Sequence, residues 1–185
     1  IRDMISSGGA ALEPYAQTML PPLLQFAERD EEGVRNVVAE CLGKLAAVAP
    51  TAVIPQLIAL LPSPSAVTRT TVVSCVRFTV TAAAATPLPA PLQEALPDFL
   101  QTLADPDLKV RRSALLTFNC IAHNKPTAIR EVLPSLLPLL YAETQKRPEL
   151  VHQVDLGPFK HTVDDGLELR KAAFECMETL LFSGV

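Results

Sequence analysis

The amino-acid sequence predicts an all-α fold, an α-α superhelix in which helix pairs stack side by side. Apolar residues recur at helical spacing along most of the chain. Within the helical patterns, one set of leucine-proline or isoleucine-proline pairs recurs at intervals of 34, 42 and 37 residues: 20–21, 54–55, 96–97 and 133–134. Repeats of this length are typical of solenoids, in which each unit buries its apolar face against the next.

A recurring arginine supports the same division. Each of the first three arginines lies 14 residues after the proline of its unit, whereas the fourth lies 36 residues after Pro134, so the last unit carries an insertion of 22 residues. The four are Arg35, Arg69, Arg111 and Arg170. An acidic residue precedes three of them (Asp30, Asp107 and Asp165). We expect a structural ladder in which the guanidinium groups bridge carboxylates and carbonyls of neighbouring turns.

Each unit is expected to contain two helices and a tight turn. In the third unit, Pro106 keeps its predecessor out of the helical region and Asp107 can cap the second helix. A proline inside each first helix (Pro21, Pro55, Pro97 and Pro134) should bend that helix. Residues 1–185 therefore form one segment of about four units: 15–49, 51–84, 88–123 and 127–183, after the end of a preceding unit at 1–13. The sequence begins without an initiator methionine, and we expect it to be part of a longer solenoid.

The composition limits the classes of partner. The net charge is −4, from 16 basic and 20 acidic residues that are dispersed along the chain. Nucleic acid and anionic membranes need concentrated positive charge, so we expect neither as a partner. The composition is 49% hydrophobic but only 5% aromatic, without tryptophan, which favours a core of leucine, valine and alanine between closely packed helices.

The four cysteines are far apart and form no Cys-x-x-Cys pair (Cys41, Cys75, Cys120 and Cys176). We expect buried free thiols, which act as small apolar side chains, and not a zinc or redox site. Free thiols are typical of a reducing compartment, so the expected location is the cytoplasm and the nucleus.

The insertion at 144–164 departs from the helical pattern. Residues 150–156 partly alternate between apolar and polar, Gly157-Pro158 is a turn signal, and residues 159–163 alternate again. This pattern predicts a β-hairpin that projects from the helices. The alternative is a disordered loop. A projection that carries an aromatic residue beside a charged one is suited to recognising a partner.

Catalytic and metal sites have little support in the sequence. His152 and His161 could face each other across the hairpin, but no third ligand is evident, so we expect no metal and no cofactor. The motifs of nucleophilic hydrolases, phosphate-binding loops and zinc peptidases are missing. We therefore expect a binding protein, not an enzyme, without a small-molecule substrate.

Units of 34 to 42 residues with a proline in the first helix and Asp…Val-Arg at the turn resemble the HEAT repeat. The tetratricopeptide repeat fits less well, because its tryptophan and tyrosine positions have no counterpart here. Several runs also resemble one HEAT-repeat family, the cullin-associated, neddylation-dissociated (Cand) proteins, in their C-terminal part. The runs are 32–33, 35–45, 105–108, 110–112, 123–126, 157–167 and 170–177. The most specific is 157–167, eleven consecutive residues of the insertion.

The resemblance implies a protein-binding scaffold that docks on a cullin and regulates the assembly of cullin–RING ubiquitin ligases. It implies that a hairpin at about 149 to 162 competes with the substrate-receptor adaptor for its place on the cullin, so that adaptors are exchanged. By position, the partner-binding residues would be Leu150, Val154, Phe159, Lys160 and His161. The alternative is a structural segment of another HEAT-repeat scaffold, such as a transport receptor or a phosphatase scaffold.

Overall fold

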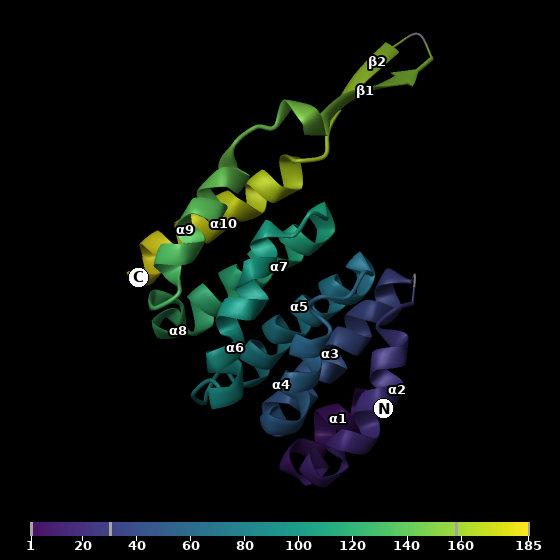
Figure 1. The fold of residues 1–185 in the computed structure, drawn as a ribbon, viewed down its shortest axis with the longest axis vertical. Helices are drawn as coiled ribbons and strands as arrows, with labels where there is room; N and C mark the ends of the chain where they lie inside the picture. The colour runs from purple at the N-terminus through teal and green to yellow at the C-terminus, as the bar shows by residue number, and fades with distance from the viewer. Residues whose placement is uncertain (1, 30, 158, 185) are drawn as a thin grey trace.

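The computed structural model contains four stacked helix pairs, in line with the helical periodicity of the sequence. It describes residues 2–29, 31–157 and 159–184. The first helices of the pairs are α2 (Ala16–Phe26), α4 (Pro50–Ala59), α6 (Ala90–Leu100) and α9 (Leu133–Thr144). The second helices are α3 (Glu32–Val48), α5 (Ala66–Ala82), α7 (Leu108–Asn124) and α10 (Leu167–Ser183). The stack runs from one end of the molecule to the other (Figure 1). The predicted all-α superhelix with a hairpin insertion is confirmed.

Short elements connect and precede these pairs. Helix α1 (Arg2–Gly8) and the 3-10 helix η1 (Gly9–Tyr15) precede α2, and Gly9 has a φ of +48° at their junction. A second 3-10 helix, η2 (Gln101–Ala104), extends α6, and a third, η3 (Pro148–Leu150), leads into the hairpin. Because a positive φ costs glycine little, the glycine at this junction allows the chain to change direction between α1 and η1.

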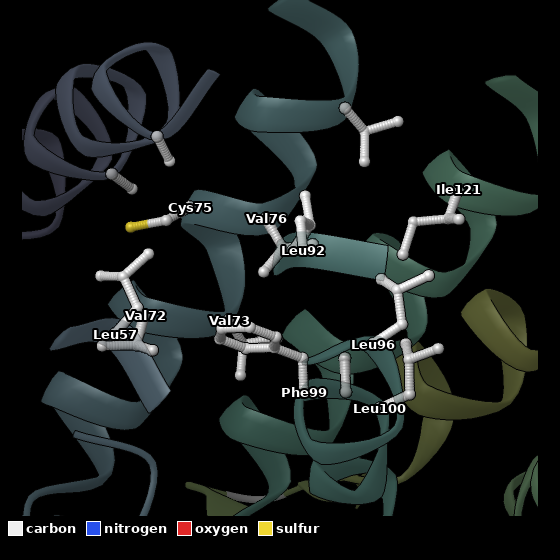
Figure 2. Packing of buried hydrophobic residues seen from close by; sticks show 14 of the residues in the cluster. Leu57, Val72, Val73, Cys75, Val76, Leu92, Leu96, Phe99, Leu100 and Ile121 are labelled. Atoms are coloured by element: carbon white, nitrogen blue, oxygen red, sulfur yellow. The ribbon is translucent and has the colours of Figure 1, made fainter. Parts of the chain in front are cut away.

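The second helices form one layer and the first helices another. In the layer of second helices, α3 packs on α5, α5 on α7 and α7 on α10. In the layer of first helices, α4 lies between α2 and α6. The apolar core fills the space between the layers, as Figure 2 shows for Val73 on α5 together with Leu96 and Phe99 on α6. Phe99 and Phe118 are the largest fully buried side chains. The remaining core is mainly leucine, valine and alanine, as the composition predicted.

Small polar side chains link the second helices directly. From α7, the hydroxyls of Ser113 and Thr117 donate to the carbonyls of Thr70 and Val73 on α5, at 3.3 and 3.1 Å. From α10, the thiol of Cys176 donates to Leu115 O at 3.2 Å, and the Ser183 hydroxyl donates to Ala122 O at 3.2 Å. Because hydroxyl and thiol groups are short, they reach a neighbouring backbone only where two helices approach closely.

The closest approach between described helices that involves a glycine lies between α3 and α5. A Cβ atom placed on Gly43 would lie 2.6 Å from the carbonyl oxygen of Cys75 and 2.5 Å from the Cβ of Phe78. Real Cβ contacts with backbone are not this short. The lack of a side chain at Gly43 therefore sets the spacing of these two helices.

The prolines agree with the prediction in three pairs and differ in the fourth. Pro21, Pro55 and Pro97 lie inside their first helices. Pro134 instead lies in the first turn of α9, which is separated from the short helix α8 (Pro126–Arg130). The prediction is therefore wrong for Pro134, although α9 does contain another proline, Pro138, within the helix. Proline lacks an N–H and collides with the carbonyl four residues earlier, whereas the first turn of a helix tolerates it, so the chain stops and restarts.

Three cysteines share one buried position. Cys41, Cys75 and Cys176 are buried and each lies six residues after the arginine of its unit, a place that the buried Thr117 takes in the third unit. Cys120 is only partly buried, so the expectation of four buried thiols is wrong for this residue. It lies nine residues after Arg111, on a less central face of α7.

We expect this difference to appear in thiol labelling. Burial raises the pKa of the Cys176 thiol to about 12 and raises that of Cys75 still further, so neither forms the reactive thiolate at neutral pH. A bulky maleimide should therefore label Cys120 first in the native chain, and the other three only in denaturant. Mass spectrometry of labelled peptides measures this order. Rapid native labelling of Cys41, Cys75 and Cys176 would contradict their placement at one buried position.

In the part of the chain that the structure describes, no helix has both the length and the apolar content needed to cross a membrane.

Candidate functional site

The insertion in the last pair forms a two-stranded antiparallel hairpin. Strands β1 (Val151–Leu156) and β2 (Phe159–Asp164) pair with each other and extend away from the helices (Figure 1). Gly157, in the two-residue turn, has a φ of +67°, the kind of backbone that tight hairpin turns require. Pro158, the other predicted turn residue, lies outside the described residues. Among the described residues β1 and β2 are the only strands, so each has one edge without a strand partner.

The register divides the hairpin into two faces. Directly opposite residues share a face, and successive residues alternate between faces. The pairs His152–Val163 and Val154–His161 therefore lie on the same face as Phe159. We call this set the aromatic face: His152, Val154, Phe159, His161 and Val163. The other face carries the pairs Gln153–Thr162 and Asp155–Lys160 and is polar.

The aromatic face is exposed. The Phe159 side chain is 74% exposed and Val154 is 38% exposed, while His152 and His161 are also exposed. Fully burying a phenylalanine side chain is worth about 1.5–3 kcal/mol. Burial of Phe159 against a partner would therefore stabilise the complex by an amount of this order. The hairpin thus displays apolar area that its own helices do not cover.

Two contacts fix the base of the hairpin to its helix pair. The Arg170 guanidinium of α10 donates to Asp164, with Nη2 2.7 Å from Oδ2. These hydrogen bonds from Arg170 hold the pKa of Asp164 below its usual range. The Asp165 backbone N–H donates to Leu150 O at 3.0 Å, closing the ladder at its base. An isolated two-stranded hairpin is marginally stable, so these contacts give it a defined origin on the stack.

On the other side of the base, a buried carboxylate joins α7 to the start of the insertion. Glu143, at the end of α9, accepts a hydrogen bond from Arg147 at 2.6 Å. Its Oε1 also lies 3.6 Å from Nη1 of Arg111 on α7. Since a buried polar group without a partner is costly, the two arginines stabilise the placement of this side chain inside the stack.

The five residues expected to bind a partner are not all brought together. Val154, Phe159 and His161 share the aromatic face, whereas Lys160 lies on the polar face. Leu150 is half-buried at the base, near Gly166. Val163 also belongs to the aromatic face but was not among the predicted partner-binding residues. Because side chains alternate between the faces of a strand, its spacing of four residues from Phe159 places the two on the same face.

The expected pairing of the two histidines is wrong. His152 lies opposite Val163 and His161 lies opposite Val154, so the two imidazoles are diagonal neighbours. His152 Nδ1 instead lies 3.6 Å from Asp165 Oδ2. Within residues 2–29, 31–157 and 159–184, no cluster of three metal-ligating side chains is found.

Two of the four arginines, Arg69 and Arg111, reach a carboxylate of the following pair, whereas Arg170 pairs with an acid of its own unit. Arg69 reaches Asp105 of the following pair with two hydrogen bonds, Nε–Oδ2 at 2.7 Å and Nη2–Oδ1 at 2.8 Å. Arg69 also donates to Ser63 O, and Arg35 similarly donates to Arg29 O, both at 2.8 Å.

The acids named from the sequence have other roles. Asp107 caps α7, accepting from the backbone N–H groups of Lys109 and Val110, which confirms the predicted cap. Arg170 pairs with Asp164, while Asp165 lies beside His152. Asp30 lies outside the described residues.

Comparison with known proteins identifies the family. The family model TIP120, described as TATA-binding protein interacting (TIP20), matches residues 128–184, from α8 through the hairpin to α10. A Drosophila melanogaster protein named cullin-associated NEDD8-dissociated protein 1 is 51% identical over 97% of this chain and 14% of its own length. Cullin-associated NEDD8-dissociated protein 2 of mouse is 46% identical over 93% of the chain and 14% of its own length. This chain belongs to the Cand family.

A third relative from the Cand family is itself named as a C-terminal part. An Emericella nidulans protein named cullin-associated NEDD8-dissociated protein 1, C-terminal part, is 43% identical over 82% of this chain and 14% of its own length. The chain spans about 14% of the length of these Cand relatives. The family resemblance seen in the sequence is confirmed, and none of these relatives is a transport receptor or a phosphatase scaffold.

Proposed function

We propose that this segment acts as a protein-binding scaffold that docks on a cullin and regulates the assembly of cullin–RING ubiquitin ligases. The names of its relatives support association with a cullin. The helix pairs supply a rigid base, and the chain contributes by binding and not by catalysis. Its four free cysteines fit a reducing compartment, so we place this activity in the cytoplasm and the nucleus.

We further propose that the hairpin competes with a substrate-receptor adaptor for its place on the cullin. The observation that carries this proposal is the exposed aromatic face on a hairpin that extends beyond the stack. A projecting element can occupy a site on the partner without moving the helices, so one surface can hold the cullin while another displaces the adaptor. Phe159 is the expected anchor, because buried aromatic residues dominate many protein interfaces.

Removing the hairpin tests competition separately from docking. Residues 152–163 would be replaced by a short Gly-Ser linker in the full-length protein, keeping Leu150 and Asp164 at the base. The helices should remain folded, because loop closure changes only slightly with loop length. Cullin binding should persist, since a long solenoid spreads its contacts over many units. Release of adaptor from a preformed cullin complex should become much slower or stop.

Point variants on the two faces provide a matched comparison. Phe159→Ala should weaken adaptor release by an amount corresponding to about 1–3 kcal/mol of interface energy. Gln153→Ala, on the polar face, should leave release nearly unchanged. Equal release by the wild-type protein and by the hairpin deletion would mean that the insertion is a passive loop. The docking proposal would then stand without the competition.

A further inference from the structure

A second surface, separate from the hairpin, lies across the layer of second helices. A groove of about 380 Å³ spans α3, α5 and α7, with residues from three consecutive helix pairs in its walls. This volume is within the range of pockets that bind ligands. The hairpin belongs to the following pair and none of its described residues lines the groove, so the groove is a surface distinct from the hairpin.

Positive charge is concentrated in this groove although the chain as a whole has a net charge of −4. Four cationic side chains line it, Arg35, Arg77, Lys109 and Arg112, against one carboxylate, Glu32. Like charges held together on one surface repel each other, and an anionic ligand relieves that repulsion.

The described carboxylates neutralise these cations only in part. Arg77 and Lys109 have no carboxylate within ion-pair distance among the residues that the structure describes. Arg112 lies 3.7 Å from Glu168, and both side chains are about half exposed, so this pair is weak. Arg77 also lies over the Phe78 ring, with 5.2 Å between its guanidinium carbon and the ring centroid, which limits where its side chain can point.

The floor of the groove is polar but its hydrogen bonds are used internally. The hydroxyls of Ser74 and Ser113 bond to each other at 2.8 Å, and those of Thr70 and Thr71 donate to backbone carbonyls. The charged donors that face a ligand are those of Arg77, Lys109 and Arg112, and the exposed Asn36 amide adds a neutral donor. Small floor residues leave room for a peptide backbone, and the guanidinium fork matches a carboxylate with two parallel hydrogen bonds.

We propose that this groove binds an acidic segment of a protein partner, whose carboxylates pair with Arg77, Lys109 and Arg112. The proposal goes beyond the competition at the hairpin, because it concerns a different face and a contact that holds a partner. A protein segment fits better than nucleic acid. A polynucleotide carries its charge far beyond one groove, where it would meet a chain with an excess of acidic residues.

A charge-matched pair of variants tests this proposal. One variant is Arg77→Gln, Lys109→Gln and Arg112→Gln, inside the groove. The control is Arg130→Gln, Lys146→Gln and Lys160→Gln, which removes three exposed cations outside the groove. Circular dichroism checks that each is folded. The probe is a fluorescent peptide of eight glutamates spaced by Gly-Ser, followed by anisotropy at low salt.

The full chain should bind the peptide, and the groove variant should lose about tenfold or more in affinity while the control loses less than about twofold. If the triple variant does not fold, Lys109→Gln alone should still weaken binding about threefold, because no described carboxylate pairs with this exposed side chain. Replacing residues 152–163 with a linker should leave peptide binding unchanged. Equal losses in both triple variants, no binding by the wild-type chain, or tighter binding of an eight-nucleotide single-stranded DNA would overturn the proposal.

Discussion

Replacing Asp105 with alanine is expected to lower the free energy of unfolding by about 3–5 kcal/mol, the usual cost of removing one partner from a buried ion pair. Asp105 receives two hydrogen bonds from Arg69 of the preceding pair and one from the backbone N–H of Asp107. Both charged side chains are largely buried. Without the carboxylate, the Arg69 charge and the Asp107 N–H would lose their partner at the junction of two helix pairs.

Urea denaturation followed by circular dichroism measures this change. Asp98→Ala is the matched control, because it removes a carboxylate of the same kind from an exposed position on α6. The control should shift the free energy of unfolding by less than about 0.5 kcal/mol. Similar losses in both variants would show that the change in net charge, and not the loss of the Arg69–Asp105 bridge, lowers the free energy of unfolding.

The same pair predicts how stability depends on pH. Burial alone would raise the pKa of Asp105, but the hydrogen bonds from Arg69 and Asp107 outweigh it and hold this pKa below its usual range. A carboxyl group with a lower pKa in the folded chain stabilises it above the unfolded pKa, and this contribution is lost as pH falls through the folded pKa. The wild-type chain should therefore lose stability below about pH 4. Asp105→Asn, which cannot titrate, should lose less over that range.

Gly43→Ala is expected to destabilise the chain by about 1–3 kcal/mol, because its new methyl group would overlap the backbone of α5. The atoms in the way are the carbonyl oxygen of Cys75 and the Cβ of Phe78, which cannot move independently of the helix. The two helices would have to separate, and the contacts between two pairs would weaken together.

Gly33→Ala in the same helix is the control, with an effect of opposite sign. A Cβ at Gly33 meets no atom within 4 Å. Because alanine favours the helix more than glycine does, this variant should be neutral or more stable by up to about 1 kcal/mol. Thermal unfolding of both variants measures the difference. A stable Gly43→Ala chain would mean that α3 and α5 are not held as closely as described.

The sequence was sufficient for the features that depend on local pattern. The spacing of apolar residues predicted the helix pairs, and the alternation around Gly157 predicted the hairpin. The exact register was not predictable to one residue. Moving the two-residue turn one position earlier would have placed His152 opposite His161, and only the folded backbone determines which turn forms.

Features that depend on stacking could not be predicted in the same way. The partner of Arg69 is Asp105, 36 residues later, and the partner of Arg111 is Glu143 in another helix. The basic groove likewise takes one or two cations from each of three units. No local pattern marks such residues, because they meet only when consecutive pairs are placed side by side.

The hydrogen bonds that join the second helices also determine how the stack can deform. Thr117, Cys176 and Ser183 each hold a particular carbonyl of the neighbouring helix. Sliding one pair along its neighbour would displace every donor of that interface at once, whereas a small tilt about the line of contacts changes each distance only slightly. The stack is therefore stiff against shear and compliant in bending. Under mechanical load we therefore expect the stack to bend while each helix pair keeps its register with its neighbour.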